Sequence, residues 1–319
     1  MTSNPTSPLS SDALTAAIRQ RTAVITGREP EDARKLRLGR LDDRAGAYGQ
    51  YFGTWDIAAG MLRDFAMYAL YPLVRMARSP GGIRQPDLIE ELLPPYTNYL
   101  GYSGFPELER FGDGLRRLAK AEAGRPLDDA LAAYFAYANR LYAWVYHYFP
   151  WHLGDRFMYP DPTVADEAEA ATVVGSARPS DRLIRLTWQP LGISVRAWLA
   201  VDQNPELCAE LLAALPFTVL QDHPMVTGES IFAWTPLVST APIHVREEIR
   251  KAPVGRLRYS QRTGQKLIVQ YGPTKETILA PLLGSVLDED LHRLPTVGRA
   301  VWNSTYRSKE LIWLTVEPC

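Results

Sequence analysis

The stretch Gly255-Arg-Leu-Arg-Tyr-Ser-Gln-Arg-Thr-Gly-Gln-Lys-Leu-Ile-Val-Gln-Tyr-Gly272 decides the β half of the fold. On both sides of a polar centre, apolar and aromatic residues fall at every second position, which is typical of half-buried strands. We predict a hairpin with its turn from Ser260 to Gln265, because Gly264 can adopt the positive φ that such a turn usually requires. The residues predicted to share the buried face are Leu257, Tyr259, Leu267, Val269 and Tyr271.

The same hairpin carries many polar side chains. Tyr259, Gln270 and Tyr271 can give or take hydrogen bonds from the wall of a cavity, and Arg258 and Lys275 can hold carboxylates. Packing is the commoner role of any single strand tyrosine. The pattern therefore indicates a ligand site on this hairpin, with packing as the alternative for each residue taken alone.

Composition limits the classes of partner. The chain has 319 residues, 46% of them apolar, which is enough for two domains with buried cores. Its net charge of −1 gives no bulk attraction to nucleic acid or membrane, so a small-molecule or protein partner is favoured. Cys208 and Cys319 form no paired motif, and we interpret Cys208 as a core thiol. We expect a cytoplasmic protein, because no leader pattern or membrane-length apolar run is visible.

The first half of the chain reads as helical. We predict a disordered tail over residues 1–11 and a helical domain over residues 12–160. One helix is predicted to begin at an N-cap on Thr54 and to bend or end at Pro72. Further helices are predicted over residues 12–25, 105–121 and 127–149.

The predicted helix over residues 127–149 has aromatic residues on several faces. An amphipathic helix at the surface of a single domain would keep one polar face. We therefore expect other elements to cover this helix on several sides, and two interpretations stay open: burial within the chain, or a homo-oligomer in which a second copy covers one face.

A stretch rich in Pro, Asp, Glu, Ala and Gly predicts a linker over residues 161–180, before a β domain over residues 181–319. A short helix is predicted from an N-cap on Asn204 to Leu215, and a second helical stretch from Ser285. A small β-barrel or sandwich with two helices accounts for this half. The predicted strands, besides the hairpin, are 183–188, 193–201, 217–220, 230–234 and 309–316.

The strong catalytic motifs are absent from the sequence: it has no phosphate loop, no HExxH, no GxSxG and no paired-cysteine zinc spacing. A polar loop precedes the predicted strand 230–234. There Glu229, before the apolar run that ends at Trp234, is a candidate general base with a raised pKa, or else an exposed turn residue. His223 is either a proton shuttle or a turn cap, and Asn303 is predicted to face the same mouth.

Three segments carry a resemblance to a known family: residues 51–65 (YFGTWDIAAGMLRDF), 102–109 (YSGFPELE) and 138–144 (ANRLYAW). Followed by a compact β domain, they resemble the cucumopine synthase family. The resemblance implies an α+β chain, with an N-terminal helical bundle followed by a cyclophilin-like closed β-barrel. It also implies a Pictet–Spengler-type condensation of an amino acid such as histidine with a 2-oxo acid such as 2-oxoglutarate, and no metal or redox cofactor.

Such a condensation needs a base, a proton donor and cations that hold carboxylates in place. From the local pattern we assign Glu229 as base, with His223 as second choice, and either Tyr259 or Tyr271 as proton donor. The substrate-binding residues are predicted to be Gln270, Arg258, Lys275, Trp234 and Asn303.

Prolyl isomerisation is not expected, because the sequence lacks the Phe-His-Arg-Val strand and the Phe-x-x-Gln-Gly-Gly-Asp loop of the isomerases with that barrel. Two other functions remain open. One is a lyase or isomerase acting on a small carboxylated substrate, and the other is a non-catalytic protein that binds a small ligand.

Overall fold

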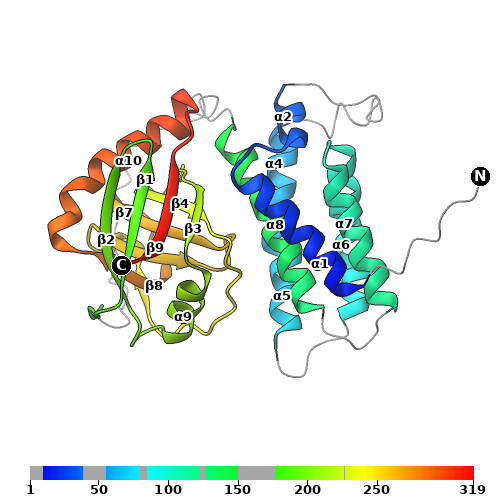
Figure 1. The fold of residues 1–319 in the computed structure, drawn as a ribbon, viewed down its shortest axis with the longest axis horizontal. Coiled ribbons are helices and arrows are strands. Elements are labelled where there is room, and N and C mark those ends of the chain that lie inside the picture. Colours follow the sequence, from blue (N-terminus) through cyan, green and yellow to red (C-terminus); the bar gives the residue numbers. More distant parts are fainter. Residues whose placement is uncertain (1–9, 39–54, 80–84, 122–126, 150–176, 226) are drawn as a thin grey trace, which may run out of the picture. The chain divides into compact units, whose positions relative to one another are not determined.

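The computed structural model describes residues 10–38, 55–79, 85–121, 127–149, 177–225 and 227–319 (Figure 1). The chain divides into two compact units, residues 1–149 and 150–319. The predicted tail over residues 1–11, the predicted N-cap Thr54 and most of the predicted linker over residues 161–180 lie outside the described residues.

The first unit is a helical bundle built around α8, Asp128–His147. All but a few residues of α8 are buried, because α1, α4, α5 and α7 all contact it. Two of its buried polar side chains are paired inside the bundle: Trp144 Nε1 donates to the carbonyl of Ile25 at 2.6 Å, and the Tyr134 hydroxyl donates to the carbonyl of Leu108 at 2.6 Å. The expectation that this helix is covered on several sides is confirmed within the unit. The other bundle elements are α1 (Ser11–Thr26), α2 (Glu31–Arg37), α4 (Trp55–Asp64), η2 (Phe65–Leu70), α5 (Tyr71–Ala77), α6 (Gln85–Tyr102) and α7 (Pro106–Ala121).

Pro72 does not end its helix, so of the two predicted outcomes, a bend or an end, the end is wrong. The chain passes from α4 through a π-helical segment, η2, directly into α5, and Pro72 lies near the start of α5. Proline cannot donate the hydrogen bond that an α-helix makes to the residue four positions earlier, and its ring crowds that carbonyl. The wider π turn before Pro72 accommodates both effects and keeps the helix continuous.

The sequence pattern did not predict α6. Two consecutive prolines, Pro94 and Pro95, lie inside it, and proline is the strongest signal against a helix interior. The buried side of α6 includes Ile89, Leu93 and Leu100, which pack into the bundle. Among the residues that the structure describes, no helix is long and apolar enough to span a membrane.

The second unit is a nearly closed antiparallel barrel with strand order β3-β9-β1-β2-β8-β6-β7-β4. The two ends of this order meet at one bridge, in which the backbones of Asp222 and Phe232 exchange two hydrogen bonds of 2.8 Å. The predicted fold class, a helical bundle followed by an antiparallel barrel, is confirmed. The strands are β1 (Leu183–Gln189), β2 (Ile193–Leu199), β3 (Phe217–Leu220), β4 (Gly228–Trp234), β5 (Arg246–Glu248), β6 (Arg256–Ser260), β7 (Lys266–Thr274), β8 (Leu279–Val286) and β9 (Trp313–Pro318).

The barrel interior is the core of this unit, and two helices contribute to it. Cys208 on α9 (Pro205–Ala214) is fully buried in that core, so the interpretation as a core thiol is confirmed. Val297 and Val301 on α10 (Leu294–Asn303) also pack into it, and α10 contacts β4 and β7. The remaining helical turns are η4 (Ile249–Lys251), η5 (Asp288–Arg293) and η6 (Ser304–Ser308).

The predicted hairpin is confirmed as β6 and β7, with Leu257 opposite Val269 and Tyr259 opposite Leu267. Gly264 has a φ of 101°, as its turn position requires. The alternating residues from Leu257 to Tyr271 all face the barrel interior. The residues between them face outward, so the polar side chains of the hairpin are divided between two faces of one sheet.

Two predictions in this half were wrong in detail. Ser285 does not start a helix, since it belongs to β8, a strand that the pattern did not predict because Pro281 interrupts its alternation. The last strand begins at Trp313, and Lys309 instead ends the π-helical turn η6. Asn204 is at the N-cap position of α9, as predicted, but its side chain makes no capping hydrogen bond.

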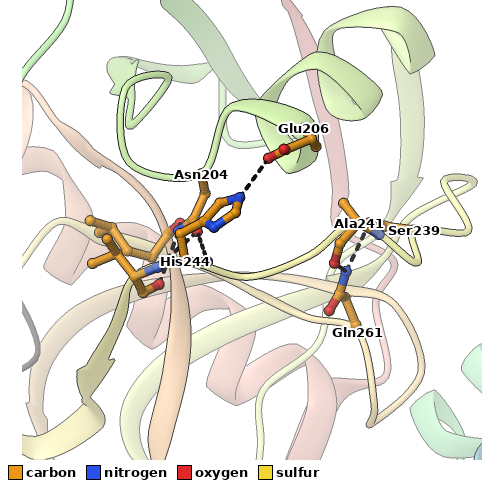
Figure 2. A network of polar contacts seen from close by, with 8 residues as sticks. Asn204, Glu206, Ser239, Ala241, His244 and Gln261 are labelled. Carbon is orange, nitrogen blue, oxygen red and sulfur yellow. Dashed lines mark hydrogen bonds and ion pairs between the residues drawn. The ribbon is translucent and has the colours of Figure 1, made fainter.

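Asn204 instead holds a loop to the barrel, as Figure 2 shows. Its side-chain oxygen accepts from the backbone of His244 and Val245, and its amide donates to the carbonyls of Val245 and Leu282. Farther along, Gln261 donates to Ser239 and to the carbonyl of Ala241. These bonds position the segment that leads into β5 and η4.

Candidate functional site

Two of the sequence-predicted catalytic residues meet at the rim of the barrel, beneath α10. His223 follows β3 in a buried loop, and Tyr271 comes from β7. Nδ1 of His223 lies 2.8 Å from the carbonyl of Pro224, and a carbonyl only accepts, so Nδ1 carries the proton. Nε2 is then the acceptor for the Tyr271 hydroxyl at 2.9 Å. The pair therefore consists of a neutral imidazole and a protonated phenol.

The electrostatics of the pair agree with these protonation states. Burial lowers the pKa of His223 to about 4, so the imidazole is neutral at pH 7. Burial, assisted by the negative charge of Glu229, raises the pKa of Tyr271 to about 12, while Arg299 acts in the opposite direction. Glu229 and Arg299 thus lie near enough to the phenol for their charges to act on it.

Two glycines make room for these side chains. The pairing of β4 with β7 is irregular between Gly228 and Ser230, and Gly228 has a φ of 98°. The side chain of Glu229, which lies between them and is exposed, lies over Gly272 of β7. A Cβ on Gly272 would overlap the Glu229 carboxylate. On the other side, a Cβ on Gly298 would overlap the Tyr271 ring, so α10 can approach β7 only because this residue is glycine.

The turn η6 adds residues to the rim that the sequence pattern did not single out. Thr305 Oγ1 accepts from the backbone N–H of His223 at 3.1 Å and lies 3.4 Å from Asp222 Oδ1. The Tyr306 hydroxyl donates to the carbonyl of His223 at 3.1 Å. Lys309 Nζ donates to the carbonyl of Thr305. A π-helical turn is a signal of functional sites, but only the structure reveals it.

A second set of polar side chains lies on the outward face of β6 and β7. Arg258 is fully buried, and its Nη1 donates to the carbonyl of Ile249 at 3.2 Å. Its Nε and Nη2 have no hydrogen-bond partner among the described residues. Burial lowers the pKa of Arg258 to about 10, against the opposing charges of Glu247 and Glu276. A buried guanidinium with unused donors is suited to a carboxylate ligand.

Gln270 belongs to the same outward face. Its amide donates to the carbonyls of Ala252 and Gly272, and its Oε1 has no hydrogen-bond partner among the described residues. Arg258 lies opposite Ile268, and Gln270 is the next residue of that face along β7. Gly272 follows on the same face, with the Glu229 carboxylate lying over it. The predicted residues Glu229, Gln270 and Arg258 therefore share one side of the hairpin.

The other predicted residues have different surroundings. Trp234 is buried on β4, and Lys266 Nζ lies 4.8 Å from the centroid of its ring. Lys275 and Asn303 are exposed. Tyr259 is fully buried, and its hydroxyl bonds to Thr235, Leu237 and Gln265 away from the rim, which favours packing over proton donation.

A charged groove of about 500 Å³ lies on the helical unit. Glu107 is its centre, because it pairs with Arg21 and Arg110 and accepts from the Tyr137 hydroxyl at 3.3 Å. Burial and the charge of Glu107 raise the pKa of Asp32 in this groove to about 6. In the described part of the chain, no three His, Cys, Asp or Glu residues gather as they would around a metal ion.

Fold and rim together define a chain of two units, a helical bundle and an antiparallel barrel with a buried histidine–tyrosine pair at its rim. Residues 11–148 match the family model of the cucumopine synthase C-terminal helical bundle domain, so the helical unit is similar to that bundle domain. The predicted resemblance is confirmed for this half. The family description places the bundle at a C-terminal position, whereas here it precedes the barrel.

Two solved structures are similar to parts of the chain. One is McbB in complex with tryptophan, with 35% identity over 42% of this chain and 44% of McbB, at a TM-score of 0.39. The chain thus spans less than half the length of McbB. The other is a hypothetical protein from Archaeoglobus fulgidus, AF2241, with 12% identity over 44% of this chain and 98% of that protein, at a TM-score of 0.31. No curated protein matches the chain.

Proposed function

We propose that this protein is a cofactor-independent condensing enzyme that joins an amino acid to a 2-oxo acid and closes a ring in a Pictet–Spengler-type reaction. The observation that carries the proposal is the match of residues 11–148 to the bundle domain of cucumopine synthase. The rim and the hairpin contain the groups that this reaction needs: a carboxylate, a protonated phenol beside a neutral imidazole, and a buried guanidinium.

Glu229 acts as the base in this proposal. Ring closure forms a carbon–carbon bond between an aromatic ring carbon and the imine carbon, and the ring must then lose a proton. Glu229 is exposed to solvent beside Tyr271, so its carboxylate can reach a bound substrate. Tyr271 stays protonated across the neutral range because its pKa is about 12. Its single O–H is donated to Nε2 of His223 in the structure, so in this proposal the O–H turns from His223 to the substrate when the substrate binds.

Arg258 holds a substrate carboxylate, and Gln270 orients the substrate beside it. The support is the unused hydrogen-bonding capacity of both side chains, which is costly to keep buried without a partner. Lys275, which is exposed on the same hairpin, is the alternative clamp. Histidine is the first candidate amine, and tryptophan joins the test because McbB was solved in complex with it.

The experiment is mass spectrometry of the purified protein incubated with histidine, tryptophan and other amino acids against a panel of 2-oxo acids. The expected product has the summed mass of one pair minus water, and its amount depends on the protein. We expect Glu229→Gln to reduce its formation by about 10²- to 10⁴-fold. The matched control is Glu310→Gln, which removes an exposed carboxylate just after the turn η6 and should retain activity.

The other outcomes separate the alternatives. A single carboxylated compound converted without addition of a second one would replace condensation by a lyase or isomerase activity. A saturable thermal shift with a ligand that is recovered unchanged would replace it by binding alone. Undiminished turnover in Glu229→Gln would remove this residue from the mechanism.

A further inference from the structure

Lys309 occupies an unusual backbone position beside the rim. It follows η6 with a φ of 60° and a ψ of 16°, the left-handed conformation in which glycine is the favoured residue. A non-glycine residue there costs about 1 kcal/mol, and such strain clusters at functional sites. Its side chain is partly exposed, whereas Asp222 and His223 are buried. Among these three residues, Lys309 is the one that a molecule from solvent meets first.

The amine of Lys309 belongs to the hydrogen-bond network of the rim. Nζ donates to the carbonyl of Thr305, whose hydroxyl in turn lies 3.4 Å from Asp222 Oδ1 and accepts from the backbone of His223. His223 continues the network to the Tyr271 hydroxyl. An amine, a carboxylate, an imidazole and a phenol thus lie in one connected group, which is the set of functions that carbonyl chemistry uses.

Partial burial also favours the neutral amine. It lowers the pKa of Lys309 to about 8, although the charge of Asp222 acts in the opposite direction. Two other lysines of the barrel are engaged by different partners. Lys251 pairs with Glu248 at 3.0 Å, and Lys266 Nζ lies within 5 Å of the ring centroids of Phe232 and Trp234.

We propose that Lys309 captures the carbonyl substrate, a 2-oxo acid, as an imine before condensation; the choice of carbonyl compound rests on the function proposed above. The amine nitrogen attacks the keto carbon and forms a carbon–nitrogen bond. The carbon–oxygen bond then breaks, and the oxygen leaves as water with both amine hydrogens. The amino group of the second substrate displaces Lys309 from this imine, which yields the substrate imine and restores the free lysine.

The test is reductive trapping. The full chain is incubated with 2-oxoglutarate alone, reduced with sodium borohydride and mapped by peptide mass spectrometry. We expect one stable adduct on Lys309, and its yield should fall at least tenfold in Lys309→Arg. Lys251→Arg, a change to an exposed lysine of the same unit that keeps the charge paired with Glu248, should leave the adduct on Lys309 unchanged. Labelling spread evenly over the exposed lysines would overturn the inference.

Lys309→Gly separates chemistry from folding. Glycine suits the left-handed conformation, so this variant should melt at the wild-type temperature or above it and still lose the adduct. Wild-type product formation by Lys309→Gly would overturn the inference and leave the proposed condensation intact. A Lys309 adduct in a protein that forms no condensation product would support the inference and reject the proposed condensation.

Discussion

At the residue scale, the position of the candidate base depends on a neighbour that has no side chain. Gly272→Ala should displace the Glu229 carboxylate, because the new Cβ would overlap it. The carboxylate can rotate away, but Cβ of Glu229 would lie 2.9 Å from the new methyl group and moves only with the backbone. We therefore expect a loss of stability of about 1–3 kcal/mol together with a loss of activity of about tenfold or more. Chemical denaturation and the condensation assay measure the two effects.

A double-mutant cycle with Glu229→Gln tests whether Gly272 acts through Glu229. If it does, the double variant should be no less active than Glu229→Gln alone. Additive losses of activity would indicate that Gly272 acts by another route, such as a change in the β7 backbone.

Tyr259 and Tyr271 are chemically alike but have different surroundings. Each loses a buried hydrogen bond on change to phenylalanine, so both variants should be destabilised by about 1–2 kcal/mol. Only Tyr271→Phe should also lower kcat, because its hydroxyl lies at the rim with His223, whereas the Tyr259 hydroxyl bonds to Thr235. Equal losses of kcat in the two variants, measured at matched folded fractions, would contradict the role assigned to Tyr271.

At the scale of elements, the rim depends on the close approach of α10 to β7. Gly298→Ala would normally stabilise a helix interior by up to about 1 kcal/mol. Here the added methyl group would overlap the Tyr271 ring, so we expect a net loss of about 1–3 kcal/mol instead. Denaturant unfolding measures this loss, and the ring proton shifts of His223 report whether its bond to Tyr271 survives. A stabilised variant would show that the helix can move away from the strand.

At the scale of the whole molecule, one titrating group in each unit shapes the dependence of stability on pH. The folded pKa of His223, about 4, lies below its unfolded value. The stability that depends on its neutral form is therefore fully present above about pH 6.5 and is lost as the pH falls toward 4. This loss of stability at acid pH amounts to about 3 kcal/mol, and His223→Gln should reduce it. Urea unfolding at pH 4.5 and 7 provides the comparison.

In the bundle, the titration of Asp32 changes stability with pH in the opposite direction to that of His223. Its folded pKa, about 6, lies above its unfolded value, so its contribution is present below about pH 3.8 and is lost as the pH rises through 6. Asp32→Asn should stabilise the protein at pH 7.5 by about 1 kcal/mol, a value reduced because the groove is partly open to solvent. A gain of the same size at pH 3.5 would contradict a titration effect.

Much of this architecture follows from the sequence alone. The alternation from Leu257 to Tyr271 defined a hairpin and the face it buries, because side chains on a strand point alternately to opposite sides. The segments that resemble cucumopine synthase indicated the bundle that the family match confirms. Proline misled the pattern within α6, because packing against α7 compensated for local costs that a sequence pattern shows in isolation. At Pro72 the π-helical segment η2 keeps the helix continuous, which the pattern could not show.

Only the tertiary structure decided which polar residues meet. His223 and Tyr271 are 48 residues apart, and Thr305 reaches His223 across 82 residues, so no local spacing could pair them. The same closure of the barrel left Tyr259 with packing partners and Lys275 exposed, although both looked equivalent to their neighbours in sequence. The period of the sequence pattern determines which way a side chain points on its strand. The strand register, the closure of the barrel and the fit of α10 onto β7 determine which residues that side chain contacts.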